Sequence, residues 1–216
     1  IKPTGALTVE AWVYVDDWSG TQEGRVVSCT QTGGYNLDIG STTVKAAVRV
    51  NSAYSSVDWP RASLASGWHH FSLTSTGEVT KLYVDGVLRD TVDLGADYDI
   101  EYSTDNSLQL GAEASGGTTP EGPYFCGRLD EFRIWSVARS KSEIQATMTR
   151  ELAGDEAGLE LYYRFDQGTP EGNNTGVTTV FDITTNGHHG SLNNFALDGD
   201  TSNWVSSYAL VRAETD

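Results

Sequence analysis

Aromatic side chains placed among polar residues are the part of this sequence best suited to ligand chemistry. Four of them fall in segments that we expect to be loops, and two charged residues lie beside the third: Trp18, Tyr54, Trp59 with Asp58 and Arg61, and Tyr124. A sugar ring has an apolar C–H face and a rim of hydroxyl groups, so aromatic rings flanked by charged and amide groups are suited to hold it. Any single ring could instead cover the end of a sandwich, because amphipathic rings are often half-buried. Four rings in separate segments favour a binding site.

Two histidine pairs, His69-His70 and His188-His189, raise the question of a metal site. Adjacent residues of a strand point to opposite faces, so neither pair can chelate a metal alone. We expect His69 and His70 to be packing residues of a strand. His188 and His189 lie in a turn-rich segment and should face solvent.

Sequence motifs of catalysis are absent. The chain contains no Gly-x-Ser-x-Gly elbow, no His-Glu-x-x-His and no Gly-x-x-x-x-Gly-Lys loop. Residues distant in sequence could still assemble a catalytic site. A hydrolase or lyase is therefore kept as a third hypothesis, and the sequence favours a protein that is not an enzyme.

The charge balance limits the possible partners. Fourteen Lys and Arg residues against thirty Asp and Glu give a net charge of -16, which repels nucleic acid phosphates and anionic membranes. No run approaches the ~18 apolar residues of a membrane span. Surface carboxylates keep a protein soluble, and they are also the oxygen ligands that calcium prefers.

Strands must position these side chains. Twenty-three glycines, ten tyrosines and six tryptophans favour an all-β chain with tight turns. Alternation of apolar and polar residues predicts strands over residues 7–15, 25–30, 34–39, 43–50, 67–76, 79–85, 87–92 and 107–111. Gly33-Gly34 and Asp85-Gly86 predict hairpin turns. Residues 51–66 and 113–123 are predicted to be loops.

The stretch from Gly127 to Trp135 predicts a further strand, followed directly by a helix. At a period of two, Asp130 shares a face with Phe132 and Ile134. Ser140 and Glu143 form a capping box, because each side chain can satisfy a backbone N–H at a helix start. The helix is predicted to run from about residue 141 to about residue 152.

Four segments together resemble the laminin-G-like jelly roll of the concanavalin A-like group: Thr8–Val13, Gly67–Phe71, Lys81–Gly86 and the strand and capped helix over 127–152. The resemblance spans residues 7–152. It implies an all-β fold, a two-sheet antiparallel jelly-roll β-sandwich with one short helix near residues 141–152. The fold hosts many activities, so it says less about function.

Residues 158–216 resemble the lead-in that precedes such a repeat in tandem arrays of bacterial surface proteins. The first strand usual in the family would lie just before Ile1. Either the chain is cut from a longer repeat, or its C-terminal strands complete the sandwich in permuted order. We favour the second, since a missing strand would leave an edge open to aggregation. The expectation is one domain over residues 1–216.

The resemblance also implies a calcium ion at the sandwich edge, bound by an Asp at the position of Asp130. Glu10, Asp38 and Asp166 are candidate partners, because the usual partner region is absent. The alternative for Asp130 is a carboxylate that caps backbone N–H groups or forms a salt bridge beside Arg128 or Arg133. Calcium would then be a structural cofactor of this chain and could assist its binding of a glycan.

The resemblance brings the strands that carry Cys29 and Cys126 close together, so it makes a disulfide plausible. A bridge closing such a loop would stabilise the fold by ~4 to 5 kcal/mol in the chain-entropy model. The alternative is two buried thiols that act as small apolar residues.

Related β-glucan hydrolases carry Glu-x-Asp-x-x-Glu on a concave strand, and that pattern does not occur here. We therefore expect a non-catalytic, lectin-like module that binds a polysaccharide or cell-surface glycan through loops at one edge. It would be a monomeric part of a larger extracellular or surface-attached bacterial protein. The alternative is an adhesion or spacer module that contacts other proteins.

Overall fold

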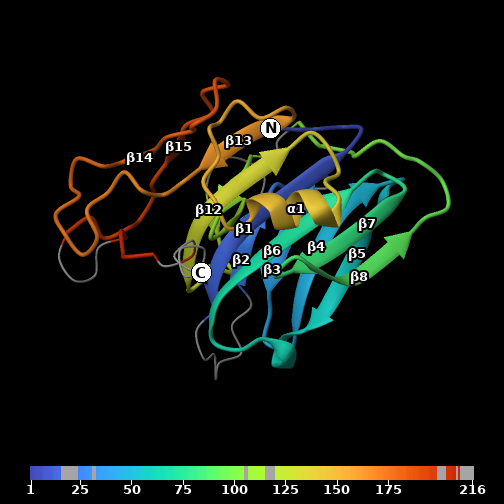
Figure 1. The fold of residues 1–216 in the computed structure, drawn as a ribbon, viewed down its shortest axis with the longest axis horizontal. Helices are drawn as coiled ribbons and strands as arrows, with labels where there is room; N and C mark the ends of the chain where they lie inside the picture. Colours follow the sequence, from blue (N-terminus) through green and yellow to red (C-terminus); the bar gives the residue numbers. More distant parts are fainter. Residues whose placement is uncertain are drawn as a thin grey trace.

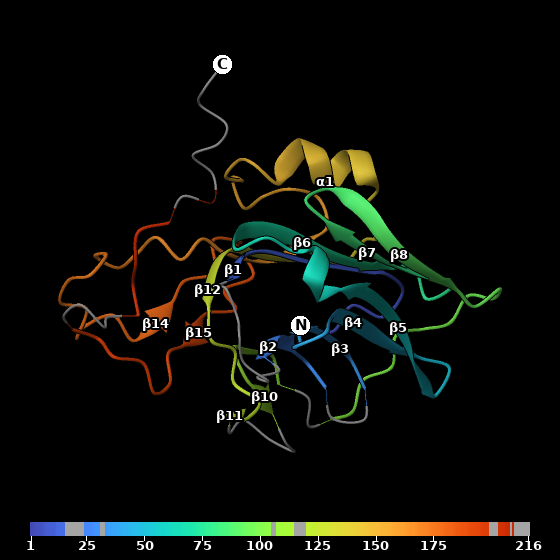
Figure 2. The same cartoon turned by 90° about the horizontal axis from the view of Figure 1, so that it is seen from below.

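Alternating apolar and polar residues build two antiparallel sheets that pack face to face, with one helix on the outside of the larger sheet (Figures 1 and 2). The computed structural model describes residues 1–15, 24–30, 33–104, 107–114, 120–198, 203–207 and 209. The predicted two-sheet β-sandwich with a single short helix is confirmed.

The larger sheet has six strands, and the first strand of the chain lies near its centre. Its spatial order is β13 (Leu159–Tyr163), β12 (Arg128–Trp135), β1 (Leu7–Val15), β6 (Gly67–Ser75), β7 (Val79–Val84) and β8 (Val87–Asp93). The turn between β7 and β8 uses Asp85 and Gly86, both at positive φ, as the sequence predicted.

The smaller sheet has five strands. Its order is β5 (Ala53–Pro60), β4 (Thr43–Val50), β3 (Tyr35–Ile39), β2 (Gly24–Ser28) and β9 (Gln109–Leu110). Two short hairpins stand beside the sheets: β10 (Glu113–Ala114) with β11 (Pro120–Glu121), and β14 (Thr179–Val180) with β15 (Gly190–Ser191). A 3-10 turn, η1 (Arg61–Ser63), follows β5.

The core lies between the two sheets. Val9, Val13 and Phe71 of the six-stranded sheet pack in one buried cluster with residues such as Leu37 and Val48 of the five-stranded sheet. Burying each side chain of this kind stabilises the fold by about 1.5–3 kcal/mol. The opposite faces of the two sheets are therefore the surfaces that remain for other roles.

Strand β5 corrects the prediction of a loop over residues 51–66. A two-residue turn joins β4 to β5, with φ of 48° at Asn51 and 59° at Ser52. This is the backbone of a tight hairpin turn, which Asn favours. The sequence signal was weak because β5 is an edge strand with few apolar residues. Its placement decides where Tyr54 and Trp59 point.

Strand β12 contains a bulge that corrects the predicted alternation. Glu131 has φ of 52°, and the pairing with β1 shifts between Glu10 and Trp12. Leu129 then pairs with Val13 and packs against the core, while Asp130 pairs with Trp12. A bulge adds one residue to a strand and so reverses the faces beyond it. Asp130 therefore does not share a face with Phe132, as the simple period predicted.

The helix α1 (Lys141–Thr147) begins as predicted and ends earlier. Ser140 and Glu143 form the capping box. At the end of the helix, main-chain carbonyl groups accept hydrogen bonds from side chains of the six-stranded sheet. Arg133 donates to Thr147 O at 3.0 Å, and Trp12 Nε1 donates to Met148 O at 2.5 Å. These contacts replace the bonds that would continue the helix to residue 152.

The C-terminal segment contributes to the larger sheet. Strand β13 pairs with β12 at the sheet edge, through Phe132 with Tyr163 and Ile134 with Leu161. The hairpin of β14 and β15 packs beside β13, where Asp182 accepts the backbone N–H of Tyr162 at 3.1 Å. Among the described residues, no helix has the length and apolar character needed to cross a membrane.

Candidate functional site

The outer face of the five-stranded sheet carries an open groove of about 600 Å³. Its side chains come from the outward positions of β2, β3, β4 and β5, with Glu113 from β10. Because the residues alternate along each strand, the apolar neighbours of these side chains fill the core beneath. The strand register arranges the lining in parallel rows across the sheet.

One row consists of charged side chains of alternating sign. Arg25 is paired across the strands with Asp38, Asp38 with Lys45, and Lys45 with Asp58. Arg25 Nη1 lies 3.2 Å from Asp38 Oδ2, and its Nη2 lies 2.9 Å from Glu113 Oε2. We call Glu113, Arg25, Asp38, Lys45 and Asp58 the charge row. Like charges are kept apart in it, and each cation has carboxylates on both sides.

The neighbouring row is small and neutral. Asn36 is paired with Ala47, and Ala47 with Ser56. Ser28 continues the row on β2, where its hydroxyl lies 2.7 Å from that of Thr30. We call these five residues the neutral row. Thr30, Asn36, Ala47 and Ser56 line the floor of the groove and offer hydroxyl and amide groups, while Ser28 is buried beneath it.

Tyr54 stands on the other side of the neutral row. Its hydroxyl lies 3.2 Å from both the N and the O of Gly33, and its side chain is 41% exposed. The Arg49 guanidinium lies 5.6 Å from the ring centroid and is itself paired with Glu101 at 3.2 Å. The ring is thus held across the sheet and forms a fixed wall of the groove.

Asp38 is the most perturbed acid of the groove. Burial raises its pKa to about 6, although the guanidinium of Arg25 and the amide of Asn36 favour the charged form. Asn36 Nδ2 donates to Asp38 Oδ2 at 2.6 Å. The centre of the charge row therefore titrates closer to neutral pH than an ordinary carboxyl group.

The structure brings together two of the residues predicted to bind ligand and separates the others. Tyr54 and Asp58 line the groove. Trp59 points to the opposite face of β5, where it packs against the core and has the Arg89 guanidinium 4.6 Å from its ring centroid. Strand geometry explains this, since neighbouring residues of β5 alternate between faces.

The remaining predicted ligand residues do not occur among the described residues that line the groove. Arg61 lies in the turn η1 after β5. Tyr124 is 57% exposed, and its main chain forms a bridge to that of Arg25 next to the groove. Trp18 lies outside the described residues.

The charge row and the neutral row were missed by the sequence interpretation, which looked for aromatic loops. Their signal was present: Asn36 and Asp38 alternate with the buried Leu37 and Ile39. That pattern predicts a polar outward face. It does not show which strands are neighbours, so the rows could not be assembled from it.

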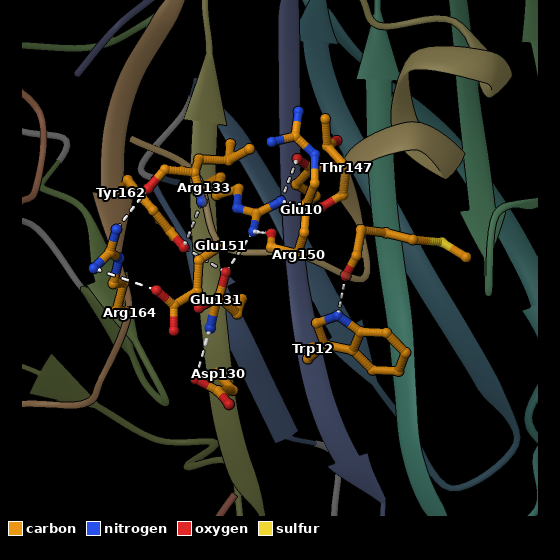
Figure 3. Close-up of polar contacts among 12 residues, drawn as sticks. Glu10, Trp12, Asp130, Glu131, Arg133, Thr147, Arg150, Glu151, Tyr162 and Arg164 are labelled. Carbon is orange, nitrogen blue, oxygen red and sulfur yellow. Dashed lines mark hydrogen bonds and ion pairs between the residues drawn. The ribbon is translucent and has the colours of Figure 1, made fainter. Parts of the chain in front are cut away.

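Glu10, a predicted calcium ligand, is bonded to side chains inside the fold. It is fully buried on the outer side of the six-stranded sheet, under α1 and the segment that follows it (Figure 3). Its Oε1 accepts from Trp135 Nε1 at 3.0 Å and from Arg139 Nη1 at 3.2 Å, and lies 3.8 Å from Arg133. A carboxylate that neutralises two buried arginines serves the fold.

Asp130 lies at the bulge of β12 and has no bond to Arg128 or Arg133 among the contacts of the described residues. Its Oδ1 accepts the N–H of Glu131 at 3.0 Å, and its Oδ2 accepts the Ser207 hydroxyl. Burial raises its pKa to about 7, and the nearby charges of Glu131 and Asp166 act in the same direction. Within the described part of the chain, no group of three or more acidic, His or Cys side chains could hold a metal.

The predicted disulfide is not formed. Cys29 is buried just after β2, whereas Cys126 is exposed in the segment that leads to β12. Tyr124 meets β2 at Arg25, near the start of the strand, while Cys29 follows its end. The two side chains thus lie in different environments, which corrects the expectation of a bridge.

The histidines have the predicted structural roles. His70 is buried edge-on against Trp12 at 5.5 Å between centroids, and burial lowers its pKa to about 4. His69 contacts Asp85 through Nδ1 at 2.8 Å. His188 and His189 are exposed.

Comparisons with known proteins agree with this architecture. The family model described as the concanavalin A-like lectin/glucanases superfamily matches residues 1–145. No curated protein matches the chain. A solved structure of a Bacteroides ovatus protein proposed to bind carbohydrate is 24% identical, with a TM-score of 0.61; the match covers 91% of this chain and 56% of that one. The chain thus spans little more than half of that protein.

Two further structures share the fold at lower identity. The CBM40 of the Ruminococcus gnavus IT-sialidase, solved with alpha2,3 sialyllactose, is 18% identical with a TM-score of 0.51, over 67% of this chain and 82% of that one. A heptameric SAP-like pentraxin from Limulus polyphemus is also 18% identical, with a TM-score of 0.50, over 67% and 70% of the two chains.

Proposed function

Because the chain belongs to the concanavalin A-like lectin/glucanase superfamily, we propose that it is a non-catalytic domain that binds carbohydrate on the outer face of its five-stranded sheet. The groove itself carries this proposal. Its floor offers hydroxyl and amide groups, and Tyr54 supplies a fixed, half-exposed ring at its side. A sugar needs this combination, because its ring faces are apolar and its edges are polar.

Two observations support binding over hydrolysis. Glycosidases of the common type place one carboxyl group on each side of the scissile bond. In the groove, Asp38 and Glu113 are both paired with Arg25, which takes the place of a sugar between them. Two similar structures are described as a protein proposed to bind carbohydrate and as a CBM40.

The test is a glycan array or affinity-gel screen with the wild-type chain and two matched variants. Tyr54→Ala removes the aromatic wall of the groove. Phe181→Ala removes an aromatic side chain of similar exposure, 51%, next to β14. We expect binding that Tyr54→Ala weakens by about tenfold or more and Phe181→Ala leaves unchanged. No retention of any glycan by a folded protein would instead favour an adhesion or spacer module.

Calcium is part of the proposal as a structural cofactor, and Asp130 is the residue that would bind it. The described residues fit it poorly, because both oxygens of Asp130 already accept hydrogen bonds. A calcium titration followed by thermal unfolding tests this. A calcium-dependent rise in Tm that is absent from Asp130→Asn would support a calcium site. Identical unfolding curves of the wild type with calcium and with EDTA would rule the site out.

We also propose an extracellular or cell-surface setting within a longer protein. Polysaccharides and surface glycans are found there, and the similar Bacteroides ovatus structure extends well beyond the part that this chain covers. Fractionation of cells that express the full-length protein tests it, and recovery only with cytoplasmic markers would contradict it.

A further inference from the structure

We propose that the ligand is an uncharged, extended glycan that lies across the strands along the neutral row, and that the charge row excludes acidic glycans. This inference rests on the proposed function and specifies the class of ligand. It follows from the strand register, from the two ion pairs of Arg25 and from the carboxylates that flank Lys45 in the charge row.

The register fixes the direction of the ligand. The part of the neutral row that lines the groove crosses three strands, from Ser56 on β5 through Ala47 on β4 to Asn36 on β3, and Thr30, just after β2, continues it. With strands ~4.8 Å apart, the two gaps between these strands give a floor of about 10 Å, which Thr30 extends further. A sugar unit advances along its chain by about one strand spacing, so the floor accommodates an oligosaccharide rather than a single terminal sugar.

The charge row and the ring of Tyr54, which flank the neutral row, exclude a ligand that runs along the strands. Such a chain would have to cross the charge row on one side, where Arg25 is bonded to Asp38 and Glu113. On the other side it would meet the ring of Tyr54, which is fastened to Gly33. The free path is the one across the sheet, between these walls.

The charges determine what the groove rejects. Its lining has two cations, Arg25 and Lys45, and three carboxylates, Asp38, Asp58 and Glu113, so its net charge is 2 − 3 = −1. Arg25 is bonded to two carboxylates, and Lys45 stands between Asp38 and Asp58. A uronate or sulfate would have to displace a carboxylate from Arg25, would meet Asp38 and Asp58 on either side of Lys45, and would approach a molecule of net charge -16. Specificity of this kind comes from repulsion as much as from attraction.

The first experiment tests whether the ligand lies along the neutral row. Ala47→Phe adds a large ring in the middle of the floor, where Ala47 is 2% exposed, and Ala47→Ser is the matched control; thermal unfolding verifies that both variants are folded. Wild-type protein and both variants are compared on the neutral polysaccharide that retains the wild type most among a β-glucan, a xylan and a mannan. A disaccharide and a hexasaccharide of the same polymer are then titrated calorimetrically.

We expect Ala47→Phe to weaken binding by about tenfold or more, and Ala47→Ser to leave it unchanged. The hexasaccharide should bind more tightly than the disaccharide. Equal affinities of the two oligosaccharides, together with loss of binding in Ala47→Phe, would overturn the extended ligand while the proposed function stands. Binding that both Ala47→Phe and Tyr54→Ala leave intact would overturn the proposed function at this site as well.

The second experiment tests exclusion by charge. The double variant Asp38→Asn, Glu113→Gln removes the two carboxylates bonded to Arg25 with little change of shape. We expect immobilised polygalacturonate to retain this variant and not the wild type, and added salt to reverse the retention. Thermal unfolding verifies that the variant is folded. Wild-type protein that binds polygalacturonate as tightly as the neutral polymer would overturn the proposal.

Discussion

Arg133 illustrates how single residues hold the covered face of the six-stranded sheet. Its guanidinium is 1% exposed and bonds to Glu131, to Thr147 O at 3.0 Å and to Arg150 O at 2.8 Å (Figure 3). Tyr162 donates to the same Glu131 carboxylate at 2.5 Å. One side chain thereby joins β12 to the segment after α1. A buried charge of this kind is tolerated only while its partners remain.

Removing Arg133 should therefore destabilise the fold strongly. We expect Arg133→Met to lower the free energy of unfolding by about 3–5 kcal/mol, because Glu131 is left buried without its cation. Urea unfolding measures this. The double variant Arg133→Met, Glu131→Gln should lose less than the sum of the two single variants, and additive losses would show that the pair is not coupled.

Asp130 should make stability depend on pH. Its pKa is raised to about 7, so the folded protein keeps a proton that the unfolded chain releases near pH 4. Between these values the folded state binds more protons, and the contribution of Asp130 to stability is lost as pH rises. We expect Asp130→Asn to be more stable relative to the wild type at pH 8 than at pH 4. Parallel stability curves for the two proteins would contradict this.

At the scale of elements, β5 shows that one strand serves two purposes. Tyr54 and Asp58 face the groove, while Val57 and Trp59 face the core. The sequence placed the aromatic residues correctly near a polar surface and assigned them to a loop. The Asn51-Ser52 turn makes the segment a strand, and its alternation then sends Trp59 to the other side.

The two aromatics of β5 should separate stability from binding. We expect Trp59→Ala to lower the free energy of unfolding by about 2 kcal/mol through lost packing, without direct loss of glycan contacts. Tyr54→Ala should weaken binding and destabilise the fold less. Urea unfolding and affinity gels on both variants measure this. The assignment would be reversed if a folded Trp59→Ala no longer bound glycan while Tyr54→Ala bound it as strongly as the wild type.

The elements that sequence predicted well are those with strong local signals. β1, β4 and the capping box of α1 occur where alternation and the Ser140–Glu143 spacing placed them. The end of α1 and the bulge at Glu131 depend on bonds to distant strands, which no local pattern contains. For the same reason, outward polar residues could be identified from sequence, whereas the rows they form across the sheet required the register.

For the whole molecule, the C-terminal segment is part of the fold although the family model ends at residue 145. Strand β13 covers the edge of β12, and its Leu161 and Tyr163 join the main core. The residues that the family model matches therefore do not include all of the residues that form the core of this chain.

A chain that ends at residue 157 should not form a stable monomer. It would expose the edge of β12 and leave Glu131 without Tyr162, and an open hydrophobic edge promotes aggregation. Size-exclusion chromatography and urea unfolding measure this against the full chain. A soluble monomer with unchanged stability would show that β13 is dispensable.

The central position of β1 has a consequence for biosynthesis. Leu7–Val15 leaves the ribosome well before β12, one of its two neighbours in the sheet: Trp135 bonds to Glu10 across 125 residues. At roughly 5–20 residues per second, the first strand waits on the order of ten seconds for that neighbour. During that interval the nascent chain exposes an apolar strand. We therefore expect chaperones that bind unfolded chains to bind it at this stage.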